Sequence, residues 1–147
     1  MKRNNSALFF TCSLIEFIGR KTRNKRQDVL DHLGNEDVAR IYRYADVFHC
    51  EPIEKVADDF IQKGHIPFGT FDNIADCRYT VPDYWDIGEV FERLIEDTGE
   101  DSDVIECIFS VYHSWITDHI LNFNSDLFYQ SRDYIAACYR AGRILAT

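Results

Sequence analysis

The stretch Ala7-Leu-Phe-Phe-Thr-Cys-Ser-Leu-Ile-Glu-Phe-Ile-Gly-Arg20 decides the fold class of this chain of 147 residues. Its apolar residues recur at helical spacing in two neighbouring rows, so the apolar arc is wide and predicts a helix that faces the core. Gly19 lies near the end of the stretch, and Arg20 and Lys21 follow. Positive charge at this place is typical of a helix C-terminus.

The same periodicity predicts six more helices. They are expected over residues 24–34, 35–48, 52–63, 82–98, 102–122 and 131–145. Asn24, Asn35 and Ser131 have the side chains that cap helix N-termini, and Pro52 suits the first position of a helix. More than half of the circumference of the 102–122 helix is apolar, so we expect it to be the central helix.

Residues 64–82 lose this periodicity and contain repeated Pro and Gly turn signals. Their large apolar side chains predict a loop pinned to the core, with a short strand over Cys77–Val81. These side chains are Phe68, Phe71, Ile74 and Tyr79. The sequence therefore predicts an all-α fold, a single orthogonal bundle of about seven helices with one long irregular loop at about 64–82. We expect one domain over residues 1–147, within which 1–63 and 82–147 could form two packed lobes.

The composition is that of a compact domain with uneven charge. It is 46% hydrophobic and 14% aromatic, with a net charge of -9. Residues 1–43 carry +4, residues 44–126 carry -15 and residues 127–147 carry +2. An acidic chain lacks the dense Lys/Arg footprint that neutralises phosphates, which argues against general nucleic-acid binding.

Membrane insertion and secretion are not predicted. The longest apolar stretch, Ala7–Ile18, is interrupted by polar residues and falls short of the ~20 residues that a membrane span needs. The cysteines are odd in number, form no Cys-x-x-Cys pair and follow no leader sequence, so we expect a cytoplasmic protein with reduced thiols. They are Cys12, Cys50, Cys77, Cys107 and Cys138.

Residues 20–26 form a basic segment with five cations: Arg20, Lys21, Arg23, Lys25 and Arg26. Next to two predicted helices, this segment raises the alternative of helix-turn-helix DNA binding. Glu36 and Asp37, at the start of the third predicted helix, would repel phosphates. We therefore prefer a solvated helix junction or a patch that docks a partner.

The fifth predicted helix has an acidic face formed by Asp86, Glu89, Glu92 and Glu96. Paired carboxylates can act as general acid and base or bind a metal, but no metal-binding loop or phosphate-binding glycine motif accompanies these. Two readings stay open. In the first, the face is simply solvated. In the second, it docks a basic partner, and salt lowers the rate at which the two proteins associate.

Two further pairs are weak candidates for chemistry. His49 and Cys50 are adjacent at the end of the third predicted helix, whereas catalytic Cys and His usually come from separate elements. Glu106 and His113 lie in one polar row of the sixth predicted helix and would need a third group to hold a metal. We predict no catalytic residue, no cofactor and no metal site.

Several segments resemble a family of short uncharacterised bacterial proteins. The resemblance covers residues 8–61 and rests on five segments: Phe9-Phe-Thr-Cys-Ser-Leu-Ile-Glu-Phe-Ile18, Val29-Leu-Asp-His-Leu-Gly34, Ile41-Tyr42, Ala45-Asp-Val-Phe-His49 and Val56-Ala-Asp-Asp-Phe-Ile61. That family is similar to small partners encoded beside ADP-ribosyltransferase-type toxins. The resemblance implies a regulatory, antitoxin-like role and no catalytic residue, and the second half of the chain has no counterpart in it.

Three functional hypotheses follow. The leading one is a non-enzymatic interaction protein that docks a partner protein, or a second copy of itself, through an acidic surface. The first alternative is a small hydrolase or transferase that uses His49, Cys50 or His113 in a cleft beside the 65–81 loop. It requires two of these side chains to meet in one pocket. The second alternative is a DNA-binding regulator that acts through residues 20–26.

Overall fold

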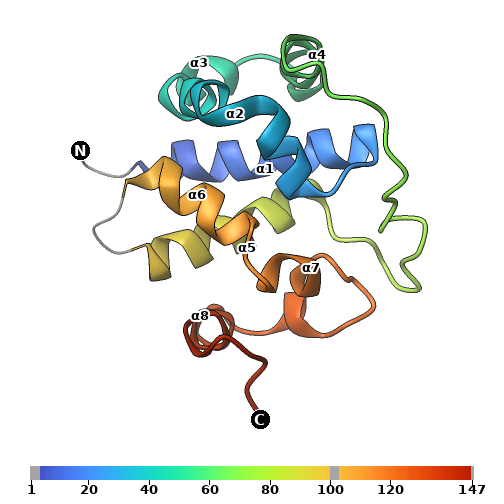
Figure 1. Ribbon diagram of the computed structural model, residues 1–147, viewed down its shortest axis with the longest axis vertical. Helices are drawn as coiled ribbons and strands as arrows, with labels where there is room; N and C mark the ends of the chain where they lie inside the picture. The colour runs from blue at the N-terminus through green and yellow to red at the C-terminus, as the bar shows by residue number, and fades with distance from the viewer. Residues whose placement is uncertain (1–3, 100–102, 147) are drawn as a thin grey trace.

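The computed structural model describes residues 4–99 and 103–146, which form an all-helical fold (Figure 1). The elements are α1 (Asn5–Thr22), α2 (Arg26–Arg43), α3 (Ala45–Phe48), α4 (Ile53–Lys63), α5 (Tyr84–Thr98), α6 (Val104–Tyr112), α7 (Ile116–Ile120), a 3-10 helix (Leu127–Tyr129) and α8 (Arg132–Ala141). The all-α prediction is confirmed. The strand expected at Cys77–Val81 was wrong, because no strand occurs anywhere in the described ranges.

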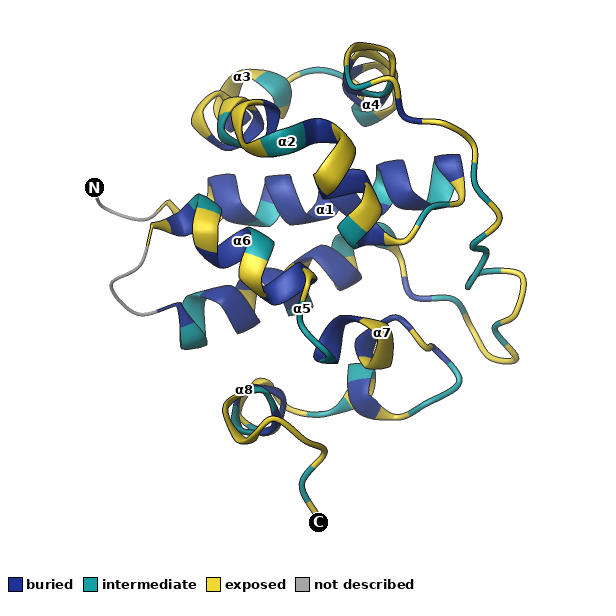
Figure 2. Cartoon of the chain, in the orientation of Figure 1, coloured by how far each residue is buried: buried dark blue, intermediate teal, exposed yellow. Residues whose placement is uncertain are grey.

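The central helix is α1. It lies across the middle of the molecule, contacts α2, α3 and α4 on one side and packs along α5 on the other (Figure 1). Helices α4 and α8 are seen end-on in this view while α1 runs across it, as expected for an orthogonal bundle. Figure 2 shows that α1 is buried along most of its length. The prediction that residues 102–122 form the central helix was therefore wrong.

The contact between α1 and α5 is unusually close. A Cβ atom placed on Gly88 of α5 would lie 2.0 Å from Ser13 Oγ and 2.8 Å from the Ser13 Cα atom. Only glycine therefore allows the two backbones this separation. The N-terminus of α5 is fixed by Asp83, whose side chain accepts a hydrogen bond from the Trp85 amide.

The predicted 102–122 helix is two helices, α6 and α7, separated at His113–Trp115. The hydroxyl groups of Ser114 and Thr117 both donate to the Val111 carbonyl, at 2.6 and 2.8 Å. Hydroxyl side chains that take a carbonyl in this way compete with the backbone ladder, and the helix breaks. Asp103 caps α6 by accepting from the amides of Ile105 and Glu106, whereas the predicted start at Ser102 lies outside the described residues.

Other boundaries shift for local reasons. Gly34 separates the predicted second and third helices with φ of 76°, and the structure joins them as the kinked helix α2. Tyr44 then interrupts the third predicted helix before α3. Pro52 lies at the N-cap of α4 and not at its first helical position. The Ser131 cap is confirmed, since its hydroxyl accepts a hydrogen bond from the Tyr134 amide.

Asn24 does not cap a helix. Its side-chain amide donates to the Pro67 carbonyl at 2.7 Å and so ties the loop 64–83 to the α1–α2 junction. Ile74 packs against the core, as predicted, and Ile66 is buried as well. Phe68 and Tyr79, by contrast, are 80% and 63% exposed, so the prediction that they pin the loop to the core was wrong. The loop is thus held by polar contacts as much as by apolar ones.

The buried apolar side chains of the helices form one cluster, which includes residues from α1 through α8. Within the described part of the chain, no helix is both long enough and apolar enough to cross a bilayer.

Candidate functional site

The cations of the basic segment 20–26 are paired with carboxylates of the same chain, one of them in the core and the others at the surface. Arg26 is fully buried, and its Nε and Nη2 atoms each donate to a Glu16 oxygen at 2.8 Å. Arg20 donates to the same carboxylate at 2.7 Å. Glu16 is itself buried on α1. This three-residue cluster holds the α1–α2 junction together, and Arg26 is not part of the surface.

The three lysine and arginine residues between Arg20 and Arg26 also face acids. Lys21 Nζ lies 2.6 Å from Asp58 of α4. Arg23 faces Asp72, and Lys25 faces Asp118, both at 3.8 Å. These ion pairs reduce the positive charge that the segment could offer to a phosphate backbone.

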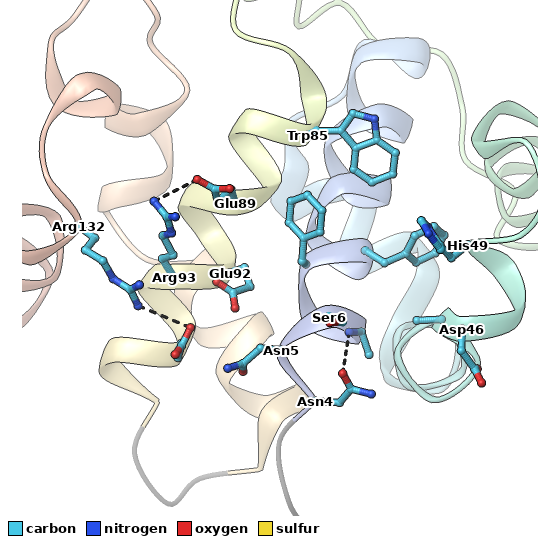
Figure 3. A pocket seen from close by; sticks show the side chains of 15 residues that line it. Asn4, Asn5, Ser6, Asp46, His49, Trp85, Glu89, Glu92, Arg93 and Arg132 are labelled. Carbon is cyan, nitrogen blue, oxygen red and sulfur yellow. Dashed lines mark hydrogen bonds and ion pairs between the residues drawn. The ribbon is translucent and has the colours of Figure 1, made fainter.

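Three of the four residues of the predicted acidic face meet in one cleft. Glu89, Glu92 and Glu96 line a cleft of about 670 Å³ between α5 and the N-terminal half of α1 (Figure 3). We call it the acidic cleft. Asp86 lies one turn nearer the start of α5 and lines a different groove.

The walls of the acidic cleft come from four elements. Helix α1 supplies Phe9 and Phe10, and α5 supplies Trp85 beside its glutamates. The Phe9 and Trp85 rings lie 5.5 Å apart. His49, which follows α3, packs edge-on against Phe10 at 6.3 Å. Arg132, the first residue of α8, lies at the far end of the α5 wall (Figure 3).

Two arginines partly offset the carboxylates. Arg93 lies 3.0 Å from Glu89, and Arg132 lies 3.5 Å from Glu96 (Figure 3). Arg132 also binds Asp97 more closely, at 2.6 Å. With Asp46 of α3 on the opposite wall, the carboxylates outnumber the arginines. The cleft keeps a negative balance when all four of its carboxyl groups are ionised.

Glu92 lies deepest among the glutamates of α5 and is only 7% exposed. Burial, followed by the hydrogen bond and the charge of Glu96, raises the pKa of Glu92 from 4.5 to about 7, while Arg132 and Arg93 oppose the shift. A carboxyl group of this pKa is partly protonated at neutral pH. It can therefore exchange a proton when a charged ligand enters the cleft.

The other candidate residues do not converge. Cys50 donates its thiol proton to the Asp46 carbonyl, while His49 points into the acidic cleft. His113 lies between α2 and α6, where Nε2 contacts Asp31 Oδ1 at 2.7 Å and Nδ1 contacts the Phe109 carbonyl. Glu106 lines a separate pocket near Tyr42. The loop 65–81 does not border the acidic cleft, so the pair required by the enzyme alternative is not assembled.

The acidic cleft is suited to binding. It has an aromatic floor, an acidic wall and two arginines held by ion pairs.

Burial raises the pKa of the Cys12 thiol to about 12, so this core cysteine is not a thiolate nucleophile. In the described residues, no group of three or more His, Cys, Asp or Glu side chains gathers in a way that could hold a metal ion.

The glutamates and His49 were both candidates in the sequence, but nothing in it placed them in one cleft, and the other lining residues were not predicted. Trp85 belongs to the apolar periodicity of its helix, and such periodicity does not distinguish a core face from the lining of a cleft. Asp46 and Arg132 carry no local signal, since they reach the cleft only through the packing of α3 and α8. Comparisons with protein-family models, curated proteins and solved structures found no match to this chain.

Proposed function

We propose that this chain is a non-enzymatic interaction protein whose acidic cleft binds a basic segment of a partner protein. The observation that carries the proposal is the meeting of Glu89, Glu92 and Glu96 with the aromatic pair Phe9 and Trp85 in one concavity. Carboxylates beside aromatic rings favour a Lys or Arg side chain, which can pair with the first and stack on the second.

The resemblance of residues 8–61 supports a narrower proposal for the partner. It implies an antitoxin-like role, with an ADP-ribosyltransferase-type toxin as the protein that is bound. The resembling part of the chain would then supply the α1 and α3 walls of the acidic cleft, including Asp46 and His49. Helix α5, which lies outside that part, would add the glutamates.

A direct test is titration with a labelled basic peptide of about twelve residues that alternates Arg and Leu, followed by fluorescence anisotropy. At pH 8 and about 50 mM salt we expect a Kd of roughly 1–100 µM, and weaker binding at about 300 mM salt. The double variant Asp46→Asn/Glu89→Gln should weaken binding by about 5–30-fold, because it removes one charge from each wall. A purified ADP-ribosyltransferase-type toxin is the second probe.

The matched control is Asp59→Asn/Asp133→Asn, which removes two exposed charges outside the acidic cleft. It should leave peptide binding within about twofold of the unsubstituted protein. Equal weakening by both double variants would contradict the proposal, as would binding that does not respond to salt. A dimer that dissociates only in the cleft variant would identify a second copy of the chain as the ligand.

A further inference from the structure

Two exposed tyrosines from distant parts of the chain border a second groove. Tyr79, in the loop 64–83, is 63% exposed, and Tyr129, at the end of the 3-10 helix, is 57% exposed. Both line a groove of about 630 Å³ between residues 79–82 and 123–129. We call it the aromatic groove. Large aromatic side chains left in water around one concavity are typical of a binding surface.

Hydrogen bonds within the chain hold the aromatic groove in shape. The side chain of Asn124 joins its two edges: Oδ1 accepts from the Arg78 amide at 2.8 Å, and Nδ2 donates to the Asp76 carbonyl at 2.9 Å. Arg20 donates to the Pro82 carbonyl and places its guanidinium 5.8 Å from the centre of the Phe123 ring. A preformed surface loses little conformational entropy when a ligand binds.

The rings of the aromatic groove are turned steeply against one another. Phe128 meets Phe123 at 67° with the ring centres 6.3 Å apart, and it meets Tyr129 at 80° with the centres 5.0 Å apart. Phe123 is buried, so the groove presents Phe128 and Tyr129 to a ligand. Grooves lined by aromatic rings accept the pyrrolidine rings of an extended polyproline II segment, which is already ordered before it binds.

The aromatic groove is negatively charged and therefore favours a positively charged ligand. Asp86 and Asp126 are exposed side chains in the lining, which contains neither Lys nor Arg. We propose that the aromatic groove binds a proline-rich segment of a partner protein that also carries Lys or Arg. The carboxylates pair with the cation, and Tyr79, Phe128 and Tyr129 contact the proline rings. This site is separate from the acidic cleft and does not depend on its function.

The test uses the full chain and synthetic peptides. The probe is a fluorescein-labelled proline-rich peptide of about ten residues that ends in two arginines, and its binding is measured by fluorescence anisotropy. We expect a Kd of roughly 10–500 µM, because the groove is open and small for a protein interface. Tyr129→Ala should weaken binding by about tenfold or more, and Asp86→Asn/Asp126→Asn by about three- to tenfold.

Two matched controls keep the proposal falsifiable. Tyr44→Ala removes a tyrosine that is 47% exposed but lies outside the groove, and it should leave the affinity unchanged. Glu89→Gln alters the acidic cleft and should also leave it unchanged. The proposal is overturned if the peptide does not bind, if Tyr44→Ala and Tyr129→Ala weaken binding equally, or if a peptide with glycine in place of proline binds as well. A dimer that Tyr129→Ala dissolves would also overturn it, because a second copy would then cover the groove.

Discussion

At the scale of single residues, Glu92 connects the acidic cleft to pH. Its pKa is about 7 in the folded protein, against 4.5 for an ordinary glutamate, so the folded state binds the proton more tightly than the unfolded state does. The resulting stability is fully present below about pH 4.5 and is lost as the pH rises through about 7. The neutral carboxyl group is thus the form that suits the packed structure.

Glu92→Gln should therefore make the protein more stable in alkali. Glutamine resembles the protonated glutamate and retains a donor for Glu96, so at pH 8 we expect a gain of the order of 1–3 kcal/mol in the free energy of unfolding. At pH 4.5 the two proteins should have nearly equal stability. The measurement is chemical denaturation at both pH values.

Asp59→Asn is the control for this substitution, because Asp59 is exposed on α4. It should change stability little at either pH. If Glu92→Gln gains nothing at pH 8 relative to pH 4.5, Glu92 is not held in its neutral form by the structure.

The fate of individual charges was the hardest feature to predict from the sequence. Arg26 belongs to a cationic run and so resembled a surface residue, yet it is fully buried against Glu16. One signal was present: Glu16 lies inside the most apolar helical stretch, where an unpaired carboxylate would be costly. This signal pointed to a buried cation beside Glu16. Periodicity alone does not say which of the five cations in residues 20–26 is the buried one.

At the scale of helices, positions with strong local chemistry were predictable. Gly64 and Gly99 end α4 and α5 as expected, and Asp83 caps α5. The break between α6 and α7 was not predicted, because Ser114 and Thr117 are compatible with a continuous helix until their hydroxyls bond to a carbonyl. The close contact at Gly88 was equally invisible, since it depends on which helix faces it.

Gly88→Ala should destabilise the protein. Alanine in the interior of a helix normally gains about 1 kcal/mol over glycine, but here the new methyl group meets the Ser13 backbone. We expect a net loss of about 1–3 kcal/mol and a fall of roughly 3–12 °C in the melting temperature, followed by circular dichroism.

The double variant Gly88→Ala/Ser13→Ala tests whether the loss of stability comes from a clash with Ser13. It removes the hydroxyl that lies nearest to the new methyl group but leaves the Ser13 backbone in place, so the double variant should recover only part of the loss. An unchanged or higher melting temperature for Gly88→Ala alone would show that α1 and α5 are not this close.

At the scale of the whole molecule, the uneven charge of the chain becomes a set of internal contacts. Lysines and arginines of the 20–26 segment pair with acids from α4, from the loop 64–83 and from α7. The charge split was visible in the sequence, but its meaning was not, because pairing depends on which elements become neighbours. Asp46 and Glu89 of the acidic cleft and both carboxylates of the aromatic groove are among the exposed acids.

The packing of α1 on α5 joins parts of the chain that lie on opposite sides of the loop 64–83. A cut between Ala75 and Asp76, both exposed, would turn this intramolecular contact into an interface between two molecules. Neither piece could bury its half of the contact alone, so the pieces should reassemble when mixed, with a melting temperature that rises with their concentration. Gly88→Ala would weaken this reassembly. If each piece were fused to a different protein, the pieces would refold when those two proteins bound each other. Folding of the split chain would then indicate that the two proteins had met.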